Sequence, residues 1–187
     1  HPQRVEAAAD VKKVLLLGSL SPEKGLRVVE KVAILAAAQV PTLSFQLIGF
    51  STDPVDAPLA MTGDYAEQDL PRLIAEQKPD VIWMPAQVPE TFCFTLSHAL
   101  ASGVPIVASD MGALPERLED VPNARLIPSD ASCEAWLQAL QDATEAKPAS
   151  ARVVSDNLDE YARWYMKDIN KVVSKSEVDT LALLASI

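Results

Sequence analysis

Along most of the chain, short apolar runs alternate with segments in which apolar residues recur every three or four positions. A short apolar run bounded by turn residues is typical of a buried parallel strand, and the longer spacing is typical of a helix that packs on a sheet. The apolar runs predict strands over residues 11–17, 43–50, 81–85, 105–109 and 124–128, the last of them at a sheet edge. The periodic segments predict helices over residues 24–38, 67–77, 91–102, 131–145 and 151–167.

The alternation of strands and helices predicts an α/β fold with a Rossmann-like, doubly wound parallel sheet and right-handed crossovers. A loop over residues 51–60 is expected to hold one short extended piece at its end. We assign residues 1–10 to a leader or linker, 11–167 to a single domain and 168–187 to a C-terminal tail with helical spacing. Because the chain starts at His1 rather than Met, we expect it to be a piece of a longer protein.

Residues suited to tight turns gather at the carboxyl ends of the predicted strands. Gly18-Ser19 follows the first strand, Gly49 follows the second, and residues 85–90 and 109–113 follow the next two. Ligands of open parallel sheets bind at this edge, where glycine lets the backbone approach them closely. The sequence therefore predicts a ligand site built from these four turns.

Composition narrows the class of ligand. The chain has 187 residues, of which 49% are hydrophobic and 5% aromatic, and its formal net charge is −10. Such an acidic balance argues against a nucleic-acid surface and against a patch that binds anionic membranes. No signal peptide or membrane-spanning run is evident. Cys93 and Cys133 lack metal-ligand spacing, so we expect no metal site. A secreted disulfide scaffold would normally have more than two cysteines, which favours a cytoplasmic setting. No His-Asp partner for Cys93 is evident, so we expect a structural rather than a nucleophilic role for it.

The segment "GSLSPEKG" indicates an anion site. A turn at Gly18-Ser19 exposes backbone N–H groups, and Lys24 at the start of the predicted helix adds its charge to the positive end of that helix. The segment is neither a P-loop nor a G-x-G-x-x-G dinucleotide fingerprint. A diphosphate grip is one interpretation, and an ordinary lysine in the first turn of a surface helix is the other.

Glu90 precedes the helix predicted over residues 91–102. The first turn of that helix, Thr91 to Phe94, would present unpaired N–H groups to the same crevice. An ionised carboxylate only accepts hydrogen bonds, which suits a ligand rich in hydroxyl groups. Two alternatives stay open, namely that Glu90 caps the helix and that His98, two turns further on, is a half-buried packing residue.

A second glycine turn follows the strand predicted over residues 105–109. Gly112 again lets the backbone approach a ligand. For Asp110, Glu116 and Arg117 we expect pairing with neighbours, or capping of the short helix that follows, rather than catalysis.

The run "PETFCFTLSHALASGVPIVASDMGALPERL", residues 89–118, resembles the C-terminal half of family-four-type retaining glycosyltransferases of the GT-B fold. That family carries P-E-x-F-G, a helix with a second Glu, a small-Gly-x-Pro-Val-Val-Ala-Ser-Asp segment and a Gly-x-x-x-Glu turn. Residues 17–26, 45–50 and 62–76 are similar to further family elements in the same order. The resemblance thus spans residues 11–145.

The resemblance implies one Rossmann-like half of a GT-B enzyme, which holds a nucleotide diphosphate sugar donor. A separate N-terminal domain would hold a glycan or lipid-linked acceptor, so this chain alone should bind nucleotide without turnover. It implies bacterial polysaccharide, lipopolysaccharide or glycoprotein assembly in the cytoplasm, without metal or cofactor. Peripheral association of the whole enzyme with a membrane is compatible with this assignment.

The resemblance also implies roles for individual residues. Lys24 would contact the diphosphate and Glu90 would bind hydroxyl groups of the donor sugar, and these two would carry the catalytic roles. Other positions would approach the pyrophosphate, the sugar, the ribose or the base. The implied donor site comprises Gly18, Ser19, Lys24, Gly49, Tyr65, Glu90, Thr91, Phe92, Cys93, Phe94 and His98.

Three positions depart from the family pattern. Ser19 replaces an Arg that would help to neutralise the leaving diphosphate. His98 replaces the helix Glu, and a neutral imidazole accepts one hydrogen bond from a ribose where a carboxylate accepts two. Cys93 replaces a Gly. These changes leave two alternatives to a transferase: a non-catalytic scaffolding domain derived from one, and a nucleotide-sugar 2-epimerase half, which would need further acid-base carboxylates.

Overall fold

The structure is a computed structural model that describes residues 10–150 and 161–163. The chain divides into two units, His1–Arg152 and Val153–Ile187, and the description below concerns residues 10–150 of the first. Residues 161–163 are helical. The rest of the helix predicted over 151–167, the predicted tail and nearly all of the predicted leader lie outside the described residues.

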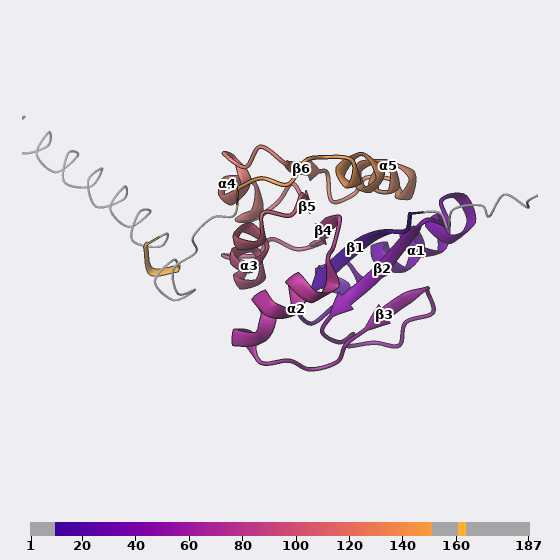
Figure 1. Ribbon diagram of the computed structural model, residues 1–187, viewed down its shortest axis with the longest axis horizontal. Coiled ribbons are helices and arrows are strands. Elements are labelled where there is room, and N and C mark those ends of the chain that lie inside the picture. Colours follow the sequence, from indigo (N-terminus) through magenta and orange to yellow (C-terminus); the bar gives the residue numbers. More distant parts are fainter. Residues whose placement is uncertain (1–9, 151–160, 164–187) are drawn as a thin grey trace, which may run out of the picture. The chain divides into compact units, whose positions relative to one another are not determined.

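Six parallel strands form one sheet in the order β3-β2-β1-β4-β5-β6 (Figure 1). This order confirms the predicted doubly wound sheet, because the chain moves outward from β1 in one direction and then returns to build the other half. The extended piece predicted before Thr62 is the edge strand β3, and the strand predicted over 124–128 is the opposite edge, β6. The strands are β1 Lys12–Leu17, β2 Leu43–Ile48, β3 Leu59–Met61, β4 Val81–Met84, β5 Ile106–Ser109 and β6 Ala124–Ile127.

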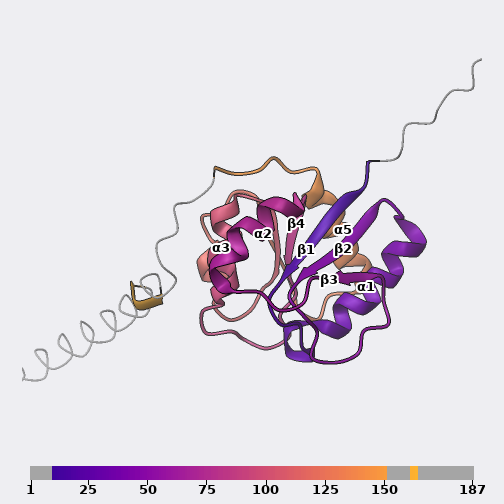
Figure 2. The same cartoon turned by 60° about the horizontal axis from the view of Figure 1, so that its bottom comes forward.

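Helices cover both faces of the sheet (Figures 1 and 2). Helices α1 and α5 pack on one face, and α2, α3 and α4 pack on the other. The α-helices are α1 Leu26–Gln39, α2 Leu70–Gln77, α3 Phe94–Ser102, α4 Leu114–Leu118 and α5 Cys133–Thr144. In the described residues no helix is long and apolar enough to cross a bilayer.

Alternation along the central strands explains why both faces are apolar. Val14 and Leu16 of β1 are buried with α1 and α5, whereas Leu15 between them is buried with α2, α3 and α4. Successive side chains of a strand point to opposite faces, so a strand covered on both sides must be apolar throughout. On the α1/α5 face, Trp83 of β4 and Trp136 of α5 are buried with ring centroids 5.6 Å apart.

Two helices begin later than the sequence predicts, and both begin after a residue in the left-handed region. A 3₁₀ turn, Pro22–Lys24, ends at Gly25 with φ 93°, and α1 starts only at Leu26. Cys93, with φ 65°, likewise precedes α3. The predictions that Lys24 and residues 91–93 lie in the first turns of these helices are therefore wrong, because one left-handed residue interrupts the helical path at each place.

Candidate functional site

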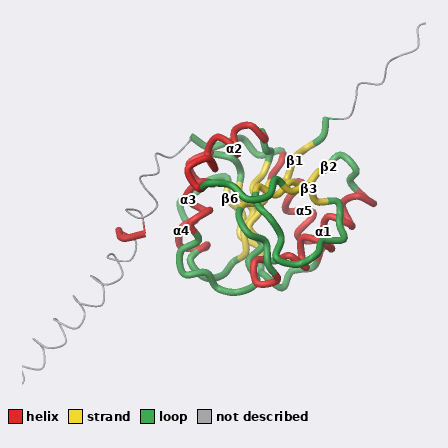
Figure 3. The backbone as a smooth tube through the Cα atoms, turned by 90° about the horizontal axis from the view of Figure 1, so that it is seen from below, coloured by secondary structure: helices red, strands yellow, loops and turns green. Residues whose placement is uncertain are grey.

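The carboxyl edge of the sheet carries the connections that the sequence assigns to a ligand site, and Figure 3 shows how the loops gather around the sheet. Gly18 donates its N–H to the carbonyl of Ile48 at 2.8 Å. A Cβ on Gly49 would lie 1.9 Å from the carbonyl oxygen of Gly18, and one on Gly18 would lie 3.3 Å from Cγ2 of Thr95. The close fit of these glycines brings the ends of β1 and β2 against the start of α3.

The turn that carries Lys24 is fixed against the loop that follows β4. A Cβ on Gly25 would lie 2.1 Å from the carbonyl oxygen of Pro85. Gln87 donates its N–H to the carbonyl of Glu23 at 2.7 Å. This loop continues to Glu90. The contacts therefore bring the half-buried Lys24 and Glu90 to the same cavity, although 66 positions separate them in the chain.

Two adjoining cavities open at this edge. The smaller, of about 30 Å³, is lined by Ser19, Lys24, Glu90, Cys93 and Thr95, with Trp83 and other apolar residues beneath. The larger, of about 310 Å³, is lined by Gly18, Ser19, Phe50, Asp64, Tyr65, Glu67, Leu70, Phe94, Thr95 and His98. Ser19 and Thr95 line both, so the two cavities form one continuous site.

The structure thus brings most of the predicted site residues together. Gly18, Ser19, Lys24, Tyr65, Glu90, Cys93, Phe94 and His98 all line one cavity or both. Three predicted residues line neither: Gly49 lies behind Gly18, the ring of Phe92 is buried, and Thr91 is exposed.

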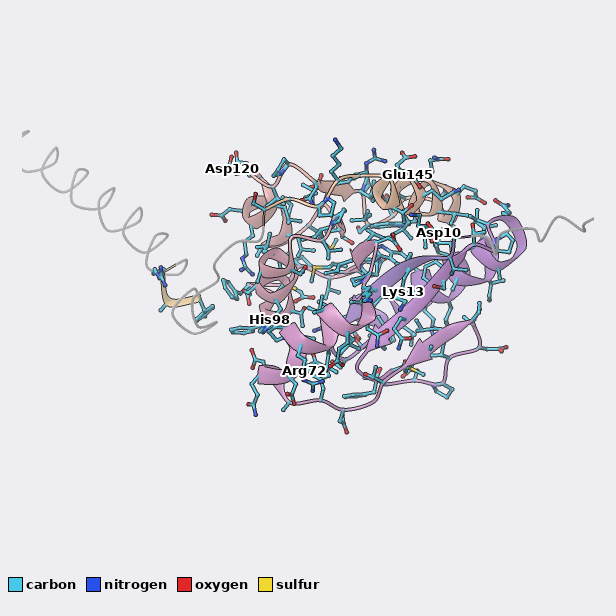
Figure 4. The ribbon with its side chains drawn as sticks, viewed as in Figure 1. Asp10, Lys13, Arg72, His98, Asp120 and Glu145 are labelled. Atoms are coloured by element: carbon cyan, nitrogen blue, oxygen red, sulfur yellow. The ribbon has the colours of Figure 1, made fainter. Side chains whose placement is uncertain are left out.

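His98, labelled on α3 in Figure 4, lines the larger cavity. It lies near a carboxylate from the preceding helical segment. Its Nε2 lies 3.6 Å from Oε1 of Glu67, which belongs to the 3₁₀ turn Glu67–Asp69 before α2. The His98 side chain is 17% exposed and that of Glu67 is 66% exposed, so the pair stands at the cavity wall. Burial, and secondarily the charge of Glu67, raise the pKa of Tyr65 in the same cavity.

Cys93 keeps a glycine-like backbone although it carries a side chain. Its Sγ is buried and lies 3.6 Å from Oγ1 of Thr95. Burial, followed by the negative charge of Glu90, raises the pKa of the Cys93 thiol to about 11. The thiol is therefore protonated at neutral pH, which fits the predicted structural role, because the thiolate is the reactive form.

Glu90 does not cap α3, so that alternative is wrong. The N-cap position is Cys93, and α3 has no side-chain cap. Glu90 and Lys24 make no ion pair with any residue that the structure describes. Both line the smaller cavity, where the carboxylate of Glu90 also interacts with the thiol of Cys93.

The sequence did not predict Glu67, Thr95 and Phe50 as site residues. Glu67 and Phe50 sit in connections whose course depends on how α2 and β3 pack, which periodicity does not reveal. Thr95 lies one helical turn before His98, and that spacing is the signal that places both on one face. The expectation that Arg117 pairs with neighbours is confirmed, because it donates to the backbone of residues 92 and 93 and to Ser97.

In the described ranges, 10–150 and 161–163, no group of three or more His, Cys, Asp or Glu side chains is arranged to hold a metal ion. The site instead offers one ammonium group, carboxylates and aromatic rings around two connected cavities.

Comparison with known proteins gives concordant matches. The family described as "Glycosyl transferases group 1" matches residues 11–145. A GDP-mannose-dependent alpha-mannosyltransferase of Mycolicibacterium smegmatis is 38% identical over 101 residues, which cover 51% of this chain and 25% of that protein. The chain thus spans about a quarter of the length of this curated relative.

Solved structures of low sequence identity share the fold. The C-terminal domain of a glycosyl transferase group 1 family protein, LpcC of Francisella tularensis, superimposes with a TM-score of 0.58 at 18% identity, over 82% of this chain and 86% of that one. Anabaena Alr3699/HepE in complex with UDP-glucose gives a TM-score of 0.61 at 20% identity, over 89% of this chain and 50% of that one.

Proposed function

Because the chain belongs to the glycosyl transferases group 1 family, we propose that it is the nucleotide-sugar-binding half of a glycosyltransferase. The whole enzyme would transfer a sugar from a nucleotide diphosphate donor to a glycan or lipid-linked acceptor. The observation that carries the proposal is the pair of connected cavities, one with Lys24 and Glu90 and the other with Tyr65 and His98. This arrangement offers the larger cavity to the nucleoside and, beside it, the side chains of Lys24 and Glu90 to the sugar diphosphate.

The larger cavity would take the nucleoside. Its volume of about 310 Å³ lies at the lower end of the range that is typical of small-molecule sites. The rings of Phe50, Tyr65 and Phe94 offer flat apolar surface to a base. Glu67 and His98 stand together at the wall, where they would accept hydrogen bonds from the ribose hydroxyls.

Lys24 and Glu90, which line the smaller cavity, would contact the diphosphate and the start of the sugar. Lys24 is the one cationic side chain that lines either cavity in the described residues, so the proposal assigns neutralisation of the departing diphosphate to it. Glu90 would accept hydrogen bonds from sugar hydroxyls and so orient the sugar for transfer. Ser19 contributes a hydroxyl and no charge, so charge stabilisation rests on Lys24.

The rest of the enzyme enters as part of the proposal. A second, acceptor-binding domain would complete the cleft, since the chain covers 50% of the length of its UDP-glucose-bound neighbour. We assign the enzyme to bacterial polysaccharide or lipopolysaccharide assembly in the cytoplasm, where peripheral contact with a membrane would deliver a lipid-linked acceptor. The free thiols of Cys93 and Cys133 favour a reducing compartment.

A scaffolding domain without catalysis is the second candidate. The small volume beside Glu90 favours it, because a cavity of about 30 Å³ holds little more than a water molecule or two. The family match supports a transferase over an epimerase. Binding of a nucleotide sugar by the chain distinguishes the transferase half from the scaffolding domain.

Calorimetric titration of the 187-residue chain with UDP, GDP, TDP, CMP and their sugars tests the proposal. We expect one nucleotide sugar to bind, and Lys24→Ala to weaken it about 10- to 100-fold, because a charge-assisted contact to phosphate is lost. Glu90→Gln should weaken the binding of the nucleotide sugar more than the binding of the bare nucleotide.

Two exposed residues supply matched controls. Lys31→Ala and Glu119→Gln make the same changes of charge on the surface, at residues that line neither cavity. Both should bind as the wild type does. If no nucleotide sugar binds at millimolar concentration, or if Lys24→Ala and Lys31→Ala behave alike, the donor-site proposal fails.

A further inference from the structure

We infer that Arg117 is a positioning residue, which holds residues 90–93 so that Glu90 and the start of α3 face the sugar end of the site. The inference rests on the proposed function, since it concerns the donor sugar. Arg117 lines neither cavity, so any effect on a ligand must pass through the segment that it holds.

The guanidinium group of Arg117 makes four contacts with the segment before α3 and with α3 itself. Its Nη1 donates to the carbonyl oxygens of Phe92 at 2.9 Å and Cys93 at 3.0 Å, and its Nη2 donates to Oγ of Ser97 at 2.8 Å. The guanidinium carbon also lies 3.9 Å from the centroid of the Phe92 ring. A planar group with fixed donors and a stacking face suits this arrangement, and a lysine could reproduce only part of it.

The turn before α4 holds the other end of the same segment. Ala113 donates its N–H to the carbonyl of Glu90 at 2.9 Å. A Cβ on Gly112, which has φ 61°, would lie 2.6 Å from both the backbone nitrogen and the carbonyl oxygen of Glu90. Residues 112–117 therefore contact the segment at Glu90, at Phe92 and at Cys93.

The segment needs such support because it lacks regular hydrogen bonding of its own. Residues 85–93 lie between β4 and α3 without helix or strand. Within them Cys93 adopts φ 65°, a conformation that is costly for any residue except glycine and persists only where neighbours enforce it. The contacts from Arg117 fall on this residue and on the one before it. We conclude that Arg117 keeps Cys93 in this conformation and thereby sets the position of Glu90.

The first test measures binding. The affinity of the chain for UDP-glucose is compared with its affinity for UDP, and its affinity for GDP-mannose with that for GDP. For Arg117→Gln we expect the affinity for the nucleotide sugar to fall about tenfold, through loss of charge-assisted bonds, with little change for the diphosphate. The affinity of Arg117→Lys for the nucleotide sugar should lie between those of the wild type and Arg117→Gln. The control is Arg125→Gln, which removes an exposed arginine paired with Asp142 on the surface.

The second test needs no nucleotide. In a Cys133→Ser background, Cys93 is the only thiol, and its reaction with Ellman's reagent reports local opening of the segment. Arg117→Gln should raise that rate about tenfold, because local opening becomes less costly. Arg117→Lys should restore it in part, and Arg125→Gln should leave it unchanged. If Arg117→Gln does not fold, Arg117→Lys serves alone in both tests.

The outcomes separate the two proposals. If the wild-type chain binds neither nucleotide sugar, the proposed function fails, and the thiol rate alone decides whether Arg117 holds the segment. An equal loss for nucleotide and nucleotide sugar, or no loss for either, overturns the positioning role. An unchanged thiol rate in Arg117→Gln overturns it as well.

Discussion

The two cavities at the carboxyl edge differ in size and in what forms their walls. The larger stands between α2, α3 and the ends of β1 and β2, and regular elements supply several of its lining residues. The smaller depends on residues 85–93, a connection whose shape is held from α4. Departures from the family pattern line both cavities: Ser19 lines both, Cys93 lines the smaller and His98 lines the larger. Because the smaller cavity depends on a connection without helix or strand, the binding of a nucleoside should tolerate substitutions better than the placement of a sugar.

A substitution of Gly49, which lies behind Gly18 of the larger cavity, has the largest expected effect. Gly49→Ala would place a Cβ 1.9 Å from the carbonyl oxygen of Gly18, at a φ of 136° that only glycine adopts readily. We expect the free energy of unfolding to fall by about 3 kcal/mol or more, because backbone must move to relieve the clash. Urea unfolding measures the change, and nucleotide binding should weaken with it.

Gly63→Ala is the matched control for that change. Gly63 also has a positive φ, 84°, but a Cβ there would meet no atom within 4 Å. Only the conformational cost applies, about 1 kcal/mol. Equal losses for the two variants would show that close packing of Gly49 against Gly18 does not shape the edge of the sheet.

Cys93 allows the smaller cavity to be altered in two graded steps. Cys93→Ala removes the buried sulfur but keeps the unfavourable φ of 65°, whereas Cys93→Gly removes both. We therefore expect the glycine variant to be more stable than the alanine variant by about 1 kcal/mol, the reverse of the usual order. Urea unfolding of both variants measures the difference.

Binding by the same two variants sharpens the comparison between the cavities. Both changes enlarge the space beside Glu90, so the affinity for a nucleotide sugar should rise relative to that for the bare nucleotide. An alanine variant as stable as the glycine variant would contradict the glycine-like backbone at Cys93. If the affinity for the nucleotide sugar relative to the bare nucleotide stays unchanged, the thiol of Cys93 does not limit the binding of the sugar.

The sequence predicted the architecture well because burial on two faces leaves a plain pattern. Apolar runs such as residues 81–85 mark central strands, and the turns that follow them mark the edge where Lys24 and Glu90 line one cavity. The predicted starts of α1 and α3 were wrong for a local reason: one left-handed residue, Gly25 or Cys93, delays the start of the α-helix without disturbing the apolar spacing.

Residues that act across elements were harder to predict. Glu67 reaches the larger cavity only because α2 packs on α3, and Arg117 reaches the segment before α3 only because α4 follows β5 across the same edge. Neither fact follows from spacing along the chain. Glutamate and arginine are solvent-exposed in most proteins, so residue type gave no signal for Glu67, and for Arg117 it indicated only pairing with neighbours.

The smallest expected effect concerns His98, and the structure changes how it must be tested. Restoring a carboxylate by His98→Glu adds an acceptor for ribose hydroxyls, but it also places a second negative charge where Nε2 of His98 now lies 3.6 Å from Oε1 of Glu67. Two carboxylates at such a distance repel each other, and one of them tends to take up a proton. We therefore expect His98→Glu alone to leave nucleotide affinity unchanged or lower.

The double variant His98→Glu/Glu67→Gln removes the repulsion and keeps the new acceptor. It should bind the nucleotide about three- to tenfold more tightly than the wild type, the gain expected of one good hydrogen bond. Calorimetry on the wild type, both single variants and the double variant forms a cycle whose coupling energy should differ clearly from zero. Additive effects would mean that Glu67 and His98 do not share a ligand. In that case the larger cavity would bind its nucleoside through the aromatic rings rather than through the ribose.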